Sequence, residues 1–179
     1  MKDNWGKAFT EVIKSEGGFT DDTRDPGNRL PDGRVGSTML GVTQRNWERY
    51  VGRQVTHDEM KALTPTIVQP FYKIQYWDAV KGDQLPRGID YLCYDLAVTS
   101  GPVRAGVVLQ QALGVNADGI IGRQTLNAAA LADKAQLAQK FTDQKIAFYK
   151  SLNNPVYEKG WINRANEALT IAQRMMAAG

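Results

Sequence analysis

The sequence of 179 residues contains very little of what a metal or disulfide protein uses. Cys93 is its single cysteine, so no disulfide can form within the chain and folding needs no oxidising compartment. The run "YLCYDLAV" around Cys93 is apolar, which favours a small buried side chain over a reactive thiol. His57 is the single histidine, and one histidine with one cysteine are too few for the usual zinc site. We therefore expect no metal and no cofactor.

Long hydrophobic runs are also missing. No stretch approaches the roughly 18 apolar residues of a membrane-spanning helix. The first 19 residues, "MKDNWGKAFTEVIKSEGGF", lack the apolar core and the small-residue cleavage site of a secretory signal. We therefore expect synthesis in the cytoplasm, no signal peptide and no stable insertion into a membrane. With 42% hydrophobic and 23% charged residues, the composition is that of an ordinary globular protein. The length suits one compact unit, or a main domain with a small second lobe.

The charge balance is only mildly basic. A net charge of +3 and a pI near 9.0 favour polyanionic partners, among them peptidoglycan, nucleic acid and acidic membranes. No cluster of five or more Lys and Arg residues occurs. The segment "VLQQALGVNADGIIGRQTL" has a helix–loop–helix pattern, but its second helix, "RQTLNAAALA", offers one arginine for base contacts. We expect no nucleic-acid partner.

Apolar spacing along the chain predicts a mainly α-helical fold. Trp5, Phe9, Val12 and Ile13 indicate an amphipathic first helix that stops at the Gly17–Gly18 pair. Residues 19–43, rich in Gly, Asp, Pro and Thr, are expected to form an irregular loop with short strands. Further helices are predicted over residues 41–52, 56–80 with interruptions at Pro65 and Pro70, 89–101, 103–114 and 123–132, followed by two long C-terminal helices.

Glu16 has an unusual position for a carboxylate. It continues the apolar stripe of Val12 and Ile13 by one turn, so it is predicted on the buried face, in the last turn of the first helix. Both desolvation and the negative end of the helix dipole would raise the pKa of a carboxyl group there. An acid that stays protonated near neutral pH is what general acid catalysis requires.

A second carboxylate is expected on the polar loop that follows. Asp21, Asp22 and Asp25 lie within nine residues of Glu16, and Asp32 lies further along. Glycosidases use such a pair, one group to protonate the leaving oxygen and the other to activate water or to stabilise the oxocarbenium ion. Asp22 and Asp25 are the candidates. Because Asp25 precedes Pro26 and Gly27, a turn-forming role is the rival interpretation for it.

The motifs along the chain resemble one family. "SEGGFTDDTRDPGN…STMLGVTQ" resembles the E-G-G-[FY] signature of glycoside hydrolase family 108 muramidases, which occur in phage endolysins and prophage lysis cassettes. "FYKIQYWDAVKGDQLPRGIDYLCYDLAVTSG" resembles the middle segment of that family, with its "YWD", "GDQLP" and D-x-A-V-x-S-G landmarks. "LQQALGVNADGIIGRQTLNAA" and "KGWINRANE" resemble the peptidoglycan-binding region that accompanies it. Three matches in order cover nearly the whole chain.

The resemblance implies a lysozyme-like helical fold that cleaves the β-1,4 bond between N-acetylmuramic acid and N-acetylglucosamine. It implies that Glu16 is the proton donor, favours Asp25 as the second carboxylate, and places Thr38 near the catalytic water. It also implies a catalytic region at residues 1–100 and a helical peptidoglycan-binding region at 101–179, packed together as one compact unit. The expected setting is an endolysin, a monomer made in the cytoplasm of the host bacterium that needs a holin to reach the wall.

The middle segment supplies candidates for substrate contacts. Sugar rings stack on aromatic faces, so Tyr76, Trp77, Tyr91 and Tyr94 are predicted to face the substrate, although core packing explains Tyr91 and Tyr94 equally well. Asp95 and Ser100 of the D-x-A-V-x-S-G landmark complete the predicted binding set. Three alternatives stay open at this point: a lytic transglycosylase with the same acid, a delivered antibacterial effector, and a wall-binding module without catalysis.

Overall fold

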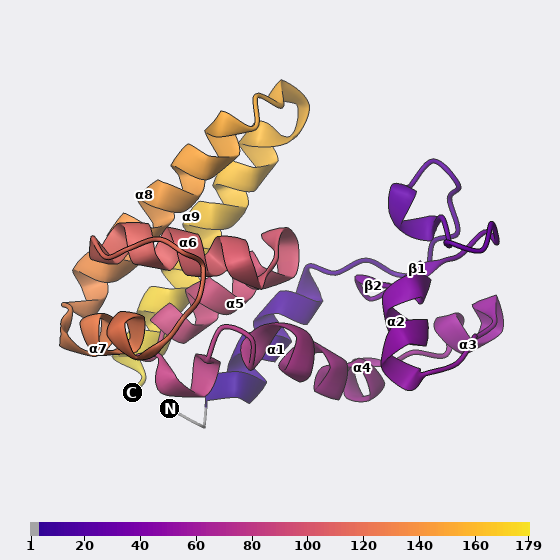
Figure 1. Cartoon of the computed structure of the whole chain (residues 1–179), viewed down its shortest axis with the longest axis horizontal. Coiled ribbons are helices and arrows are strands. Elements are labelled where there is room, and N and C mark those ends of the chain that lie inside the picture. Colours follow the sequence, from indigo (N-terminus) through magenta and orange to yellow (C-terminus); the bar gives the residue numbers. More distant parts are fainter. Residues whose placement is uncertain (1–3) are drawn as a thin grey trace. The chain divides into compact units, whose positions relative to one another are not determined.

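The structure, a computed structural model, describes residues 4–179, and most of these are helical (Figure 1). The α-helices are α1 (Trp5–Lys14), α2 (Gln44–Val51), α3 (His57–Lys61), α4 (Pro65–Tyr72), α5 (Ile89–Ser100), α6 (Pro102–Leu113), α7 (Arg123–Leu131), α8 (Lys134–Ser151) and α9 (Pro155–Ala177). Shorter turns are the 3-10 segments η2 (Pro26–Asn28) and η4 (Gly82–Gln84) and the π-helical segment η3 (Lys73–Trp77). The predicted mainly helical, lysozyme-like fold with short strands after the first helix is confirmed.

The chain forms two compact units. One consists of Phe9–Tyr72, and the other combines the residues before Phe9 with Lys73–Gly179. The helix α1 contributes to both. The division expected from the sequence, after residue 100, falls between α5 and α6 inside the larger unit. As a division between catalysis and wall binding it stays a prediction.

In the larger unit, α5 is the central helix. All residues from Ile89 to Ala97 are buried, and α5 packs against α6, α8 and α9. A helix that is covered on every side needs apolar residues all round, which explains why "IDYLCYDLAV" shows little alternation of polar and apolar positions. The two long helices α8 and α9 run side by side as a hairpin (Figure 1).

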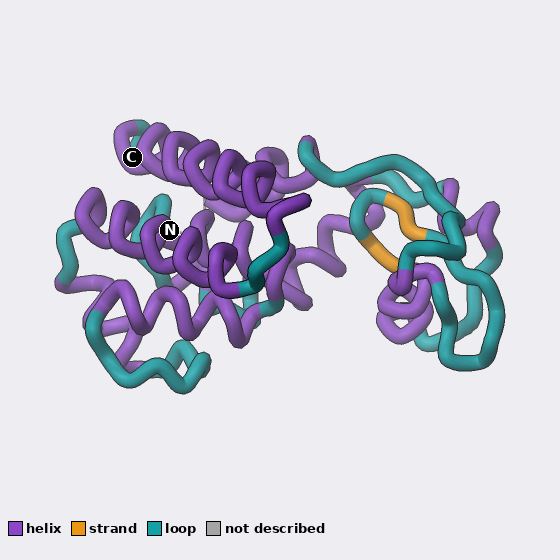
Figure 2. Tube along the Cα trace, turned by 90° about the horizontal axis from the view of Figure 1, so that it is seen from above, coloured by secondary structure: helices purple, strands orange, loops and turns teal. Residues whose placement is uncertain are grey.

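The smaller unit contains the loops. Figure 2 shows its strands as short orange stretches among teal loops. The strands β1 (Thr38–Met39) and β2 (Val42–Thr43) pair antiparallel, with Thr38 opposite Thr43 and Met39 opposite Val42. The connecting turn is Leu40–Gly41, and both residues have positive φ, +50° and +73°. Two left-handed residues in succession are what the tight two-residue hairpin turn requires.

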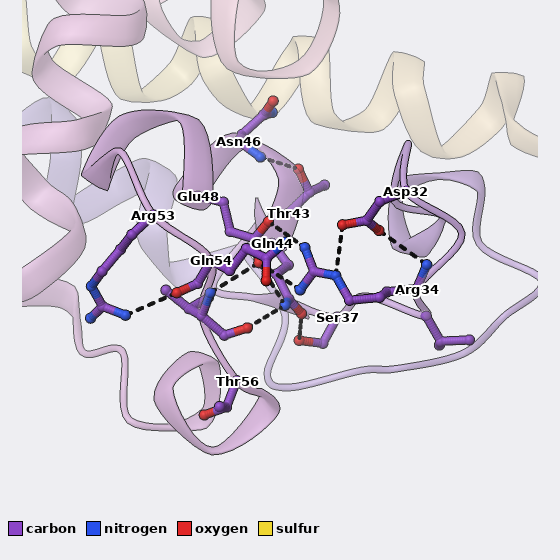
Figure 3. A network of polar contacts seen from close by, with 12 residues as sticks. Asp32, Arg34, Ser37, Thr43, Gln44, Asn46, Glu48, Arg53, Gln54 and Thr56 are labelled. Carbon is purple, nitrogen blue, oxygen red and sulfur yellow. Dashed lines mark hydrogen bonds and ion pairs between the residues drawn. The ribbon is translucent and has the colours of Figure 1, made fainter.

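A polar network around Glu48 fastens the loop of residues 29–37 to α2 (Figure 3). The guanidinium group of Arg34 donates to both carboxylate oxygens of Glu48, at 3.1 and 2.9 Å. Gln44 Nε2 and the backbone N–H of Val55 also donate to Glu48 Oε1, at 3.1 and 3.0 Å. The Arg34 hydrogen bonds are the main cause that holds the pKa of Glu48 at about 2. The network thus fixes to α2 the loop that leads into β1.

One sequence-based expectation about helix interruption is wrong in part. Pro65 begins α4, where a proline removes no helical hydrogen bond, but Pro70 lies inside α4 and the helix passes through it. The backbone widens directly afterwards into the π-helical segment η3, in which Asp78 N–H donates to the carbonyl of Lys73 at 2.8 Å. A wider turn is one way in which a helix accommodates a local disruption of its hydrogen-bond ladder.

Candidate active site

Glu16 lies at the point where α1 ends. The helix stops at Lys14, and the N–H groups of Ser15 and Glu16 donate to the carbonyls of Val12 and Ile13, at 3.1 and 3.2 Å. These i to i−3 bonds tighten the backbone and lead it out of the helix. Glu16 is therefore just beyond the last helical turn and half-buried, whereas the sequence predicted it inside that turn on the buried face.

The hairpin turn closes around the carboxylate of Glu16. Gly41 has no side chain, and a Cβ at this position would lie 2.4 Å from Glu16 Oε2 and 2.6 Å from the hydroxyl of Tyr72. The backbone N–H of Leu40 donates to the carbonyl of Gly17 at 3.0 Å, which joins the turn to the residue after Glu16. The Tyr72 hydroxyl donates to the carbonyl of Leu40 at 2.7 Å. A carboxylate, a phenol and a bare glycine backbone thus meet at one place.

The two candidate partner carboxylates have different surroundings. Asp22 forms an ion pair with Arg24, with Nη2 2.7 Å from Oδ2, and also accepts from the Arg24 backbone N–H at 2.9 Å. Arg24 lowers the pKa of Asp22 from its usual value, so this group is ionised at neutral pH. Asp25 caps the turn η2, because its Oδ1 accepts from Gly27 N–H at 2.8 Å. This contact shows that Asp25 forms the turn, as its rival interpretation predicted. A catalytic role of Asp25 stays a prediction.

Thr38 belongs to a chain of hydrogen bonds that joins the acidic loop to the hairpin. Its hydroxyl donates to Asn28 Oδ1 at 2.8 Å, and Asn28 Nδ2 donates to the carbonyl of Asp22 at 3.0 Å. Thr38 also pairs through its backbone with Thr20, across an isolated bridge. Asn28 is buried and was missed by the sequence reasoning, although the asparagine that ends "DPGN" was a signal for it.

The aromatic residues predicted to contact substrate are mostly inside the larger unit. Trp77, Tyr91 and Tyr94 are buried, with exposed fractions of 0, 3 and 0%. The rings of Trp77 and Tyr94 pack edge to face at 5.7 Å, and Trp5 contacts both. Packing of this kind is core packing, so we do not carry these three into the proposed site. Tyr76 is half-buried and stays a prediction.

Asp95 is also engaged inside the protein. Lys145 Nζ lies 2.6 Å from Asp95 Oδ2, and Arg164 Nη2 lies 3.0 Å from Oδ1. Although burial alone would raise the pKa of Asp95, the two cations hold it below its usual value. Asp95 is therefore the centre of a buried ion cluster and not a surface contact for sugar. Ser100, at the end of α5 and half-buried, stays a prediction.

A row of aromatic side chains with an exposed member, Tyr157, lies instead on α8 and α9 of the larger unit. The rings of Tyr157 and Trp161 are stacked, 5.8 Å apart with an interplanar angle of 24°, and Tyr157 is 60% exposed. The row continues to the buried Tyr149, 5.5 Å from Trp161, and on to the half-buried Phe148. The sequence reasoning missed this surface because it looked for sugar contacts only in the middle segment of the chain. Its signal was the pair Tyr157 and Trp161, four residues apart on one helix face.

Residues 4–179 contain neither a group of metal ligands nor a membrane-spanning helix. In this range, no three His, Cys, Asp or Glu side chains are grouped as metal ligands would be. None of the helices in the same range has the length and the apolar character that crossing a membrane demands.

Comparison with known proteins adds the following. Residues 9–101 match the family model described as glycosyl hydrolase 108, and residues 104–166 match one described as a predicted peptidoglycan domain. The structure is similar to that of SagA from Brucella abortus, with a TM-score of 0.83 and 34% sequence identity, over 98% of this chain and 97% of that one. No curated protein matches the sequence.

Proposed function

The chain belongs to the glycosyl hydrolase 108 family, and from that premise we propose that it hydrolyses the β-1,4 bond between N-acetylmuramic acid and N-acetylglucosamine in bacterial peptidoglycan. The family and the peptidoglycan domain at residues 104–166 together make it a glycoside hydrolase that acts on peptidoglycan. The choice of bond, and the catalytic residues, are the proposal.

The observation that carries the proposal is the position of Glu16. Its carboxylate follows α1 directly and lies against a hairpin turn whose glycine leaves room for it. Glu16 is half-buried, so its side chain is partly open to solvent, while the hairpin turn and Tyr72 lie close to its carboxylate. In the proposed reaction Glu16 protonates the glycosidic oxygen as the C–O bond breaks, and the developing oxocarbenium ion is attacked by water.

A second carboxylate would stabilise that cation or activate the water. We propose Asp25 for this role in preference to Asp22. The charge of Asp22 is already balanced by Arg24 at 2.7 Å, whereas the contact that fixes Asp25 is a single backbone N–H on Oδ1. Thr38, held by Asn28, is proposed to orient the water.

The biological setting proposed is that of a monomeric endolysin. It would be made in the host cytoplasm, reach the wall through a holin pore, and bind it through the region of residues 104–166. In that region the stacked rings of Tyr157 and Trp161 are the aromatic surface that suits a sugar ring.

The test is mass spectrometry of purified peptidoglycan after digestion by the wild type and by Glu16→Gln. Glu11→Gln is the matched control, because Glu11 lies on the same helix and pairs on the surface with Lys14 at 2.9 Å. We expect hydrated muramic-acid reducing ends from the wild type and the control, and none from Glu16→Gln. Circular dichroism of all three proteins would verify that they fold.

The other products would identify other enzymes. Anhydro-muramic ends would make the protein a lytic transglycosylase, and glucosamine reducing ends would make it a glucosaminidase. No fragments, with the protein still bound to the sacculi, would reduce it to a binding module. Digestion by Glu16→Gln at the wild-type rate would remove Glu16 from the mechanism.

A further inference from the structure

We infer that Tyr72 and Gly41 are positioning residues for Glu16, which together fix the place of its carboxylate. This inference rests on the proposed function, because it takes Glu16 to be the acid. All three residues belong to the unit Phe9–Tyr72, and they come from three elements: the end of α1, the β1–β2 turn and the end of α4.

The first step is steric. A Cβ on residue 41 would lie 2.4 Å from Glu16 Oε2, 2.9 Å from Glu16 Cδ and 2.6 Å from the Tyr72 hydroxyl. These distances are well below van der Waals contact, so any side chain at position 41 must displace the carboxylate, the phenol or both. The absence of a side chain at Gly41 is thus a requirement for the observed position of Glu16, in addition to the positive φ of the turn.

The second step concerns the anchoring of Tyr72. Its ring packs edge to face against Phe9 and Phe71, with centroids 5.7 and 5.9 Å away, and the residue is buried. Its hydroxyl donates to the carbonyl of Leu40 at 2.7 Å. A buried ring with its hydroxyl bound to the turn holds both the turn and the phenol oxygen in one place beside Glu16.

The third step follows the proton. A phenol has one hydrogen to donate, and that of Tyr72 is directed to Leu40. Toward other neighbours its oxygen can only accept, and the protonated form of the Glu16 carboxyl group is the form that could donate to it.

The experiment compares four single variants in pairs, with labelled peptidoglycan as substrate. Gly41→Ala is paired with Gly52→Ala, because Gly52 has the same left-handed backbone, φ +75°, but a Cβ added there would meet no atom within 4 Å. Tyr72→Phe is paired with Tyr50→Phe, since Tyr50 also packs on Phe71, at 5.4 Å, and its side chain reaches the surface. Thermal melting would report any loss of folding.

We expect Gly41→Ala to lower kcat about 100-fold, the cost of misplacing a catalytic group by roughly 1 Å. Tyr72→Phe should lower kcat about tenfold, with KM changed less than about twofold, and should move the alkaline limb of the rate profile to lower pH. The control variants should keep the wild-type kcat. In the double variant Gly41→Ala/Tyr72→Phe, the added Cβ no longer meets the Tyr72 hydroxyl. Gly41→Ala should therefore lower kcat at least about threefold less in the Tyr72→Phe background than in the wild type.

Equal effects within either pair, or independent effects in the double variant, would overturn the inference. If Gly41→Ala does not fold, the Tyr72→Phe and Tyr50→Phe pair decides by kcat and pH profile. Glu16→Gln separates this inference from the proposed function. An inactive Glu16→Gln with an unaffected Tyr72→Phe contradicts the positioning role alone, whereas an active Glu16→Gln contradicts both.

Discussion

The ammonium group of Lys145 lies 2.6 Å from Asp95 Oδ2, and both side chains are almost completely buried, at 1 and 3% exposed. They come from α8 and α5, fifty positions apart. Arg164 on α9 completes the cluster from the partly exposed side. The ion pair thus ties the predicted peptidoglycan-binding helices to the central helix of the same unit.

Lys145→Met should therefore destabilise the larger unit strongly. Removing one partner leaves the Asp95 carboxylate buried with its charge only partly balanced, a change that costs about 3–5 kcal/mol. Chemical denaturation of the variant would measure this loss. Lys150→Met, an exposed lysine near the end of the same helix, is the control and should change stability by less than about 0.5 kcal/mol. Similar values for the two variants would contradict the structural role of the pair.

Asp90 should make stability fall as the pH rises. Burial raises the pKa of Asp90 to about 6, even though Asn4 and two backbone N–H groups donate to it. In the unfolded chain an Asp titrates near 3.9, so between these values the folded state binds more protons, and its stability decreases with pH. Asn4 presents its Nδ2 to both carboxylate oxygens of Asp90, at 2.9 Å each.

The check is Asp90→Asn, studied by thermal and chemical unfolding from pH 4 to pH 8. The stability of the variant relative to the wild type should increase by roughly 2 kcal/mol over this range, because the penalty of ionising a buried carboxyl is gone. Asp143→Asn, exposed on α8, should show no such trend. A difference that does not vary with pH would mean that Asp90 does not titrate in this range.

Replacement of the two loop aspartates by asparagine should separate their roles. Asparagine caps a turn as well as aspartate does, so Asp25→Asn removes the charge and keeps the hydrogen bond to Gly27. We expect a loss of at least about 100-fold in the rate of peptidoglycan hydrolysis for Asp25→Asn. Asp22→Asn should lower the rate of peptidoglycan hydrolysis by no more than a few-fold. The opposite order would assign the second carboxylate to Asp22, and small equal losses would remove it from the mechanism.

Tyr157→Ala should weaken binding to the wall. The ring of Tyr157 is 60% exposed and stacked on Trp161, so its loss removes one aromatic face for a sugar ring. The expected increase in Kd for purified sacculi is about three- to tenfold, measured in the Glu16→Gln background so that the substrate is not digested. Tyr157→Phe and Val156→Ala are the controls, the second because Val156 is an exposed apolar neighbour. A loss as large for Val156→Ala would indicate general apolar contact.

Several parts of the fold could be predicted from the sequence because they depend on neighbouring residues. The spacing of Phe9, Val12 and Ile13 and the glycines after Glu16 predicted where α1 would end, within about a turn. Thr56 with Glu59 forms the capping box that begins α3, and Asp25 caps the turn at Pro26. Caps and turns are short-range interactions, so the sequence contains nearly all the information about them.

The tertiary structure decided which side chains meet. Periodicity shows that a face is apolar and not what covers it, so Trp77 and Tyr94 were as good candidates for a sugar surface as for a core until the packing was known. Periodicity also did not predict that Tyr72 and Gly41 lie close to Glu16, because these residues come from distant parts of the chain. The sequence by itself determined the helical framework and the acid at the end of its first helix. Only the folded chain decided what surrounds that acid, because those contacts depend on long-range packing.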